Sequence, residues 1–307
     1  MDEFEEMLRL NALEEEIIKR YEAGERNFAG IDLRFINISY SCFLDTNFSD
    51  TNLECSSISG TDFINANFSG ANLEWSYLPN LLINSNLSNT NLQKAKWRGA
   101  TFVNVDMTGA DLTGADLTSR KTTKLIGCDL RNANLADIKI DESVVLVSTI
   151  MPDGSIRTDS TKQIIDAQQL RQRFYREWQD NFQGIIMHDA DLSGIDLHGT
   201  WMYPLNMSEA YFSNVNFMNA DLSGIDFNRS SFICCNFRGA NLESANLEGA
   251  VFISVDFTEA NLIGAGTNLI RCILVNFQGA NGSIYGYFYV NTILPDGRYI
   301  PILIIDV

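Results

Sequence analysis

The residues that could do chemistry are few, and their spacing limits what they can do. Two histidines, His188 and His198, could share a metal ion or act as a catalytic pair. Carboxylates are frequent in the same region, with Asp191 and Asp221 as examples. Two carboxyls could work as acid and base if they converged on a cleft in unequal environments. No glycine-rich phosphate loop is found, and the abundant serines and threonines are expected to lack a nearby histidine, so no nucleophile is indicated.

The stretch that carries these residues has a period of five. Between Leu192 and Leu262, fifteen large apolar residues stand five positions apart, and the residue before each of these centres is mostly Asn or Asp. The residue two before each centre is small or β-branched, apart from Leu205. This period fits neither a β-strand, where side chains alternate, nor an α-helix, where they repeat about every 3.6 residues. The chain must therefore turn once in every unit of five.

The first half of the chain contains an array of the same kind. Its centres begin at Phe28, slip by one position after Leu78, and are interrupted again by an insertion at 118–124. Four units would close a coil of about 20 residues, so residues about 20 apart should stack at the strand spacing of about 4.8 Å. Similar residues do recur at this interval, in the sets Phe28, Phe48 and Phe68; Leu33, Leu53 and Leu73; Ile38, Ile58 and Leu78; and Phe43 and Phe63. We expect the same four-sided coil in residues 190–262.

The repeated motif is Ala followed by Asp or Asn and then Leu, as at 71–73, 110–112 and 115–117. This motif resembles that of the pentapeptide-repeat proteins, and the resemblance covers about two thirds of the chain. It implies an all-β solenoid, a right-handed quadrilateral β-helix with four pentapeptides per coil.

Both arrays have matching flanks. Apolar spacing predicts a helix over 3–23 and another over about 160–182. Each array ends in a strand-like run followed by Pro-Asp-Gly, at 152–154 and 295–297, which predicts a β-hairpin. The chain is therefore a tandem duplication in which helices and hairpins cover open coil ends. The apolar tail at 300–305 would add a strand to the last coil or hairpin, or pair with another chain.

The expected organisation has two tandem arrays, each preceded by an α-helix and followed by a β-hairpin. The parts are an N-terminal capping helix at 1–25, a first β-helix at 26–147, a hairpin plus linker helix at 148–184, a second β-helix at 185–284, and a C-terminal hairpin or strand cap at 285–307.

This fold changes the reading of the chemical candidates. His188 and His198, ten residues apart, would lie on opposite faces of a square coil. Each Asp or Asn before a centre would bond the local backbone at a corner. Six cysteines occur without a CxxC pair, and Cys128 and Cys235 are expected in the core. A filled coil without a cleft therefore predicts no enzyme activity, no cofactor and no metal site.

Surface residues remain as candidates for binding a partner. Phe35, Cys55 and Trp75 stand 20 apart and should form an outward stripe beside Tyr77. Exposed apolar patches often mark protein contacts, although the linker helix or a neighbouring module could cover them. The insertion at 118–124 would be either a solvated or a partner-binding loop. The candidate surface is Phe35, Trp75, Tyr77, Arg120, Lys121, Lys124, Trp201 and Tyr203.

The expected function is a non-enzymatic protein-interaction scaffold in the cytoplasm, as a monomer or weak homo-oligomer. The net charge of −17 argues against nucleic acid as a ligand. No long apolar run or secretory signal is present, so no membrane association is expected. The resemblance implies relatives that are numerous in cyanobacteria, mostly without a known activity.

The alternative is a DNA mimic that inhibits or protects DNA gyrase, as some family members do. Residues 27–147 hold 13 acidic and 9 basic residues, and residues 185–284 hold 10 and 3. Five coils would span about 24 Å, over which duplex DNA carries roughly 14 charges. The net negative charge of the second array is about half of this DNA charge, and that of the first array is less than a third of it.

Overall fold

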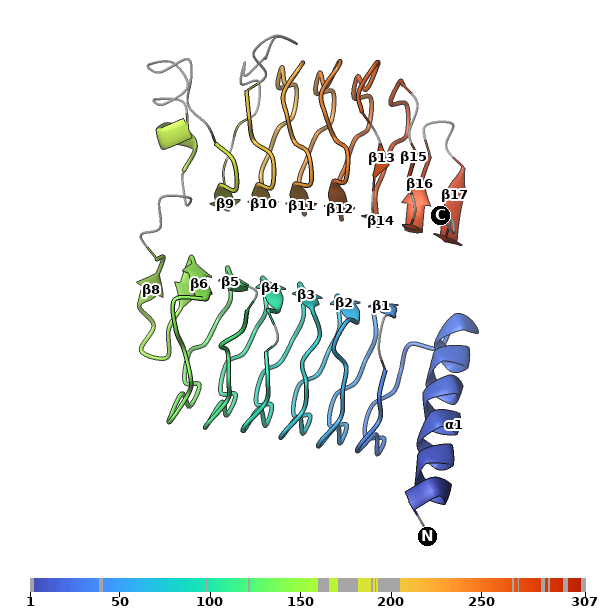
Figure 1. The fold of residues 1–307 in the computed structure, drawn as a ribbon, viewed down its shortest axis with the longest axis vertical. Helices are drawn as coiled ribbons and strands as arrows, with labels where there is room; N and C mark the ends of the chain where they lie inside the picture. The colour runs from blue at the N-terminus through green and yellow to red at the C-terminus, as the bar shows by residue number, and fades with distance from the viewer. Residues whose placement is uncertain are drawn as a thin grey trace. The chain divides into compact units, whose positions relative to one another are not determined.

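The computed structural model describes residues 3–38, 41–97, 99–120, 122–159, 166–170, 182–188, 190, 192, 205–266, 268–269, 271–282, 285–286, 288–294 and 298–304. The chain divides into two compact units, Met1–Asp159 and Ser160–Val307. Each unit is a right-handed quadrilateral β-helix, so the predicted fold class is confirmed (Figure 1).

One face of the first unit is a six-stranded parallel sheet in the order β1 to β6. Its strands are β1 Cys42–Leu44, β2 Asp62–Ile64, β3 Leu81–Ile83, β4 Thr101–Val103, β5 Thr123–Ile126 and β6 Val144–Val147. Phe43 pairs with Phe63, which pairs with Leu82, so the one-residue slip shortens that coil. Phe102 pairs with Leu125, so the insertion lengthens a later coil. The columns expected from the sequence are therefore present, with both interruptions absorbed.

The interior of the first unit is filled by its centre residues. The rings of Phe28, Phe48 and Phe68 stack with centroids 5.1 and 5.2 Å apart. The Phe43 and Phe63 rings stack at 5.2 Å and meet the Phe48 ring edge-on. All five side chains are buried, and each contributes about 1.5–3 kcal/mol. The coil is therefore a packed core that a ligand cannot enter.

The corners are held by the Asx residues that precede the centres. The Asn47 Oδ1 atom accepts a hydrogen bond from the Ser49 N–H at 3.1 Å, as expected for a turn. Asn47 Nδ2 also donates to Asn27 Oδ1 at 2.9 Å, and Asn67 Nδ2 donates to Asn47 Oδ1 at 3.2 Å. These side chains thus form ladders between coils, which the sequence analysis did not anticipate.

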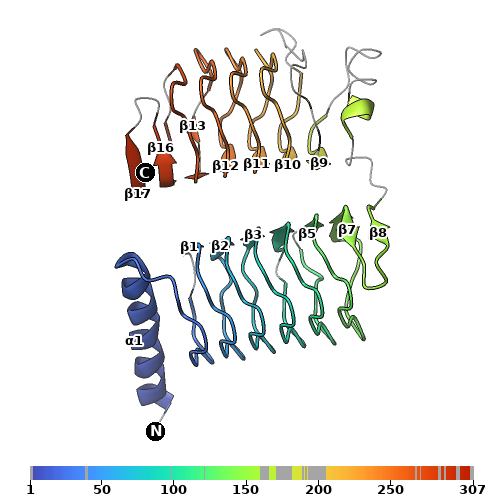
Figure 2. The same cartoon turned by 180° about the vertical axis from the view of Figure 1, so that it is seen from behind.

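Helix α1, Glu3–Glu22, covers the first coil (Figure 2). Ile17 and Tyr21 are buried in the core of the unit. The Tyr21 ring lies 4.7 Å from Phe43, and its hydroxyl accepts a hydrogen bond from the Leu44 N–H at 3.0 Å. The helix therefore provides an acceptor for one N–H group at the open edge of β1 and packs apolar side chains on the end of the coil.

The other end of the first unit carries a short hairpin. Strands β7, Thr149–Ile150, and β8, Ile156–Arg157, pair antiparallel around the Pro-Asp-Gly turn. The preceding run, β6, belongs to the parallel sheet, so it is not itself a hairpin arm. Two side chains bond backbone N–H groups along the outer edge of β6. Asp159 Oδ2 accepts a hydrogen bond from the Leu146 N–H at 2.9 Å, and Thr158 Oγ1 accepts one from the Ser148 N–H at 2.8 Å.

The second unit repeats this design. Its seven-stranded sheet has the order β17-β16-β14-β12-β11-β10-β9. These strands are β9 Ile186–His188, β10 Tyr211–Ser213, β11 Ser231–Ile233, β12 Val251–Ile253, β14 Arg271–Ile273, β16 Phe288–Ile293 and β17 Tyr299–Ile304. Strands β13, Asn268–Leu269, and β15, Tyr285–Gly286, pair on another side.

The first described coil of the second unit is longer than the sequence predicted. Met187 pairs with Phe212, and the Leu192 N–H donates to the Asn216 carbonyl. The expectation that residues 190–262 form only 20-residue coils is therefore wrong at this coil, which contains five more residues. Later coils are regular, since Phe212 pairs with Phe232 and Phe232 with Phe252.

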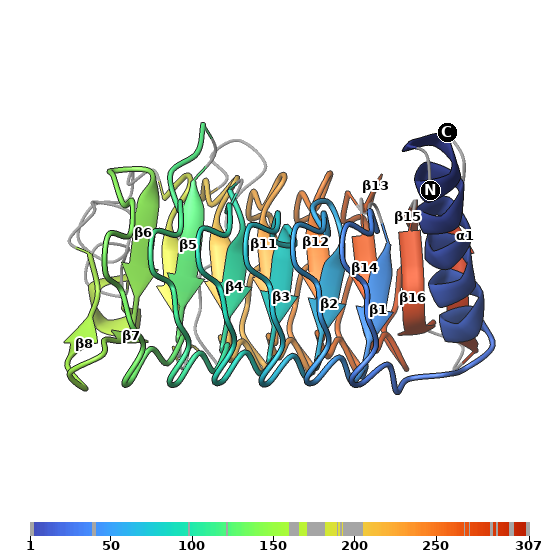
Figure 3. The same cartoon turned by 90° about the horizontal axis from the view of Figure 1, so that it is seen from below.

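The C-terminal tail lies within the sheet. Strand β16 runs parallel to β14 (Figure 3). Strand β17 pairs antiparallel to β16, for example Val290 with Ile302 (Figure 1). Of the helix predicted over 160–182, residues 166–170 and 182 are described; 167–170 are helical, and Leu170 is buried in the core of the unit. Among the described residues, no helix has the length and apolar character needed to cross a membrane.

Candidate interaction surface

The aromatic stripe predicted from the sequence lies along one corner of the first unit. Phe35, Cys55 and Trp75 occupy the same position in successive coils, two residues after Leu33, Leu53 and Leu73. Phe35 is 53% exposed, Trp75 is 46% exposed, and Cys55 is also exposed. The stripe therefore presents two large apolar side chains to solvent.

These side chains stand on left-handed backbone. The φ angles are 64° at Phe35, 57° at Cys55 and 59° at Trp75. A bulky residue at positive φ is an outlier, and the left-handed conformation costs roughly 1–2 kcal/mol for an L-residue. The corresponding corner of the second unit has Gly224, Ser244 and Gly264, also at positive φ. The two units share the geometry, but only the first places large aromatic residues on it.

Two lysines of the next coil complete this surface. Lys94 Nζ lies 4.7 Å from the Trp75 ring centroid and 3.6 Å from a Glu74 carboxylate oxygen. Lys96 Nζ lies 4.9 Å from the Tyr77 ring centroid and donates to Tyr77 Oη at 3.3 Å.

We call Phe35, Trp75, Tyr77, Lys94 and Lys96 the aromatic–lysine surface. The predicted column of outward residues ended at Trp75, so it contained neither lysine. The slip after Leu78 shortens the coil to 19 residues. Lys94 and Lys96 therefore stand 19 residues after Trp75 and Tyr77, and this spacing would have predicted them.

The Cys55 thiol in this stripe is less ionised at neutral pH than an ordinary cysteine. Its pKa is raised by desolvation and by the nearby carboxylates of Glu54 and Glu74. The protonated thiol is a weaker nucleophile than the thiolate, through which cysteine reacts. We therefore treat Cys55 as a small contact residue between the two aromatic side chains.

The basic insertion is not a single exposed cluster. Arg120 is exposed, whereas Lys124 lies in β5 with a half-buried side chain. Desolvation lowers the pKa of the Lys124 ammonium. Lys121 lies outside the described residues. The expectation that residues 118–124 form a loop is thus wrong for Lys124, because this residue pairs with Thr101 in the sheet.

The predicted surface residues Trp201 and Tyr203 lie outside the described residues, as does His198. His188 is half-buried on β9, with Nδ1 3.1 Å from Ser213 Oγ. The expectation that serines lack a nearby histidine is therefore wrong for this pair, because strand pairing brings β9 beside β10. The expectation that the two histidines lie on opposite faces stays a prediction, because His198 lies outside the described residues.

Other chemical candidates have structural partners. The Asp221 carboxylate accepts hydrogen bonds from the backbone N–H and the hydroxyl of Ser223, as the corner role predicts. Burial raises the pKa of the Cys128 and Cys235 thiols to about 12. Within the described part of the chain, no three metal-binding side chains gather in one place.

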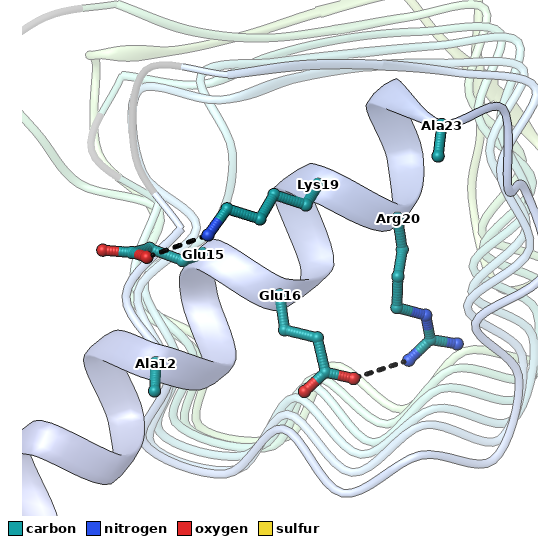
Figure 4. Close-up of a pocket in the computed structure, with 6 residues that line it drawn as sticks. All are labelled: Ala12, Glu15, Glu16, Lys19, Arg20 and Ala23. Atoms are coloured by element: carbon teal, nitrogen blue, oxygen red, sulfur yellow. Dashed lines mark hydrogen bonds and ion pairs between the residues drawn. The ribbon is translucent and has the colours of Figure 1, made fainter.

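A shallow hollow of about 500 Å³ lies along α1 (Figure 4). Its charged side chains pair with one another: Lys19 with Glu15 at 3.2 Å and Arg20 with Glu16 at 3.6 Å. We assign no ligand to it.

Comparison with known proteins identifies the family. The model for pentapeptide repeats matches eight copies, over residues 41–80, 82–119, 205–232 and 235–274. The chain belongs to the pentapeptide-repeat family. A comparison with curated protein sequences gives no match.

Several solved structures are similar in fold. One is HetL, a pentapeptide repeat protein involved in heterocyst differentiation regulation from the cyanobacterium Nostoc sp. Strain PCC 7120. It is 20% identical, and the match covers 92% of this chain and 98% of HetL with a TM-score of 0.27. A trypsin-treated form of QnrB1, a plasmid-mediated fluoroquinolone resistance protein, is 15% identical over 72% of this chain and 90% of its own, with a TM-score of 0.28. Rfr23 from the cyanobacterium Cyanothece 51142 is 22% identical over 39% and 88%, with a TM-score of 0.15.

Proposed function

We propose that this chain is a non-enzymatic scaffold that binds another protein through the aromatic–lysine surface. The observation that carries the proposal is the placement of exposed Phe35 and Trp75 on left-handed backbone. Positive φ recurs at the turns of both units, and most of the other side chains that adopt it are polar, so large apolar side chains at this position are unusual.

Stability alone gives no reason for these residues. At the same corner of the second unit, glycine and serine form the turn without a bulky side chain at positive φ. Burial also fails as a reason, since about half of each ring remains exposed. Contact with a partner does provide a reason, because large rigid aromatic side chains dominate binding energy at protein interfaces.

The experiment is affinity capture from the native host with the purified full chain. The test variant is Phe35→Asn with Trp75→Asn, since Asn tolerates the left-handed conformation. The matched control is Ile263→Asn, which removes an apolar side chain of the second unit that is 52% exposed. We expect one protein, captured in stoichiometric amount by the wild type and the control, to be lost from the double variant.

Equal capture by all three chains would exclude this surface as the binding site. Circular dichroism of each variant establishes that the fold is intact before capture is compared. The DNA-mimic alternative stays a prediction, and a gyrase supercoiling assay with the purified chain tests it. Inhibition at micromolar concentration would favour the mimic over the scaffold.

A further inference from the structure

The backbone at the aromatic corner is already hydrogen-bonded between coils. The N–H groups of Phe35, Cys55 and Trp75 donate to the carbonyls of Glu54, Glu74 and Gln93, at 3.1, 2.9 and 3.0 Å. A ligand that adds a β-strand needs unpaired main-chain groups on its receptor. These donors are occupied, so recognition here must use side chains.

The spacing of the two aromatic residues favours one ligand conformation. Phe35 and Trp75 are two coils apart, which corresponds to about 9.6 Å at the strand spacing of about 4.8 Å. A polyproline II helix repeats every three residues, or about 9.3 Å. Same-face side chains recur at about 6.7 Å in a strand and about 5.4 Å in an α-helix. The distance between successive same-face residues is therefore closest to the spacing of Phe35 and Trp75 in the polyproline II conformation.

The residue between the rings is compatible with such a ligand. Cys55 carries a shorter side chain than its two neighbours in the stripe. Proline-rich segments dock on aromatic side chains, and their preformed helix loses little conformational entropy on binding.

The lysines specify the charge of the ligand. Lys94 and Lys96 lie one coil beyond Trp75, about 4.8 Å further along the axis. At about 3.1 Å per residue, this is one or two positions beyond the second proline. Lys94 is paired with Glu74, whereas the hydrogen bond of Lys96 within this surface goes to the neutral Tyr77 hydroxyl. An ammonium has three donors, so Lys96 is the group that a ligand carboxylate would meet.

We propose that the aromatic–lysine surface binds a proline-rich segment in the polyproline II conformation with an adjacent acidic residue. Prolines three positions apart contact Phe35 and Trp75, and the carboxylate contacts Lys96. The inference rests on the proposed function and names the chemistry of the partner.

The test uses a fluorescein-labelled oligoproline ending in two glutamates and the full chain, with binding followed by fluorescence polarisation. We expect saturable binding to the wild type and to Ile263→Asn. Trp75→Asn should bind at least about tenfold more weakly, because a central aromatic anchor is lost. Lys96→Gln should lose about threefold to tenfold for this peptide.

Two control peptides separate the contributions. An oligoproline ending in two lysines should bind more weakly than the glutamate form, and Lys96→Gln should remove most of that difference. An alanine-rich peptide ending in two glutamates should not bind measurably.

No saturable binding of the proline–glutamate peptide up to about 1 mM would overturn the inference. Equal binding by the wild type and Trp75→Asn would overturn it as well. If host capture still depends on Phe35 and Trp75 while the peptide fails, the scaffold proposal stands and the ligand chemistry is wrong.

Discussion

The Lys94 ammonium lies 4.7 Å from the centroid of the Trp75 ring, although the two residues are 19 rather than 20 positions apart. The one-residue slip after Leu78 produces this spacing, since Leu82 pairs with Phe63 and Asn91 with Asn72. The coil that contains the slip is one residue shorter, so the buried centres still stack in their columns. The same shortening places the Lys94 ammonium on the exposed Trp75 ring.

Replacing Trp75 by Asn should change the stability little. The variant loses a cation–π contact worth about 0.5–1 kcal/mol and the buried half of the ring. It gains about 1–2 kcal/mol by relieving left-handed strain. We expect the free energy of unfolding to stay within about 1 kcal/mol of the wild type, measured by urea denaturation and circular dichroism. A loss above about 3 kcal/mol would show that Trp75 is a core residue rather than a surface contact.

Tyr21→Phe should weaken the cap on the first unit. The substitution keeps the ring against Phe43 but removes the hydroxyl that accepts from the buried Leu44 N–H. A buried donor left without a partner costs about 1–3 kcal/mol. The Leu44 amide should exchange its hydrogen faster than in the wild type. The midpoint of urea unfolding should be lower. Unchanged protection at Leu44 would contradict the capping role of Tyr21.

Trp97→Phe should be tolerated unusually well for a core position. Trp97 is fully buried beside Phe102, with ring centroids 4.4 Å apart, and its Nε1–H has no hydrogen-bond partner among the described residues. Removing this donor offsets the small cavity that Phe leaves. We expect a loss below about 1 kcal/mol, or a small gain. Phe48→Ala, the comparison variant, should lose about 3–5 kcal/mol. Similar losses from both variants would show that the indole N–H is satisfied.

Stability should fall in alkaline solution because of buried thiols. Burial raises the pKa of Cys128 and Cys235 from 9.0 to about 12 in the folded chain. The unfolded chain ionises first, so the stabilising contribution is complete below about pH 9 and is lost as the pH rises toward about pH 12. Urea midpoints at several pH values would measure this fall. The Cys128→Ala variant should show a shallower decline, and an identical decline would assign it to other groups.

Much of the fold could be predicted from single positions. Five-residue spacing identified Phe28, Phe48 and Phe68 as interior residues, because a filled coil needs the same residue type at each repeat. Asn47 was expected at a corner because Asx side chains bond the backbone two residues on. The exposed positions of Phe35 and Trp75 also followed from the repeat.

Pairing between coils was harder to predict. The ladder from Asn27 to Asn67 requires knowing which side chains meet across coils. Lys96 was missed for the same reason, and Lys124 was misplaced because its strand pairing was not considered. Each of these depends on a contact between residues about 20 positions apart.

The sequence by itself determined the period, the filled interior and the four-sided coil, because these follow from local residue types. Only the tertiary structure decided which pentapeptide stacks on which pentapeptide of the next coil. Met187 pairs with Phe212, 25 residues on, and no pattern of fives can reveal this. An insertion of five residues leaves every centre in phase, so its presence appears only in the hydrogen bonds between coils.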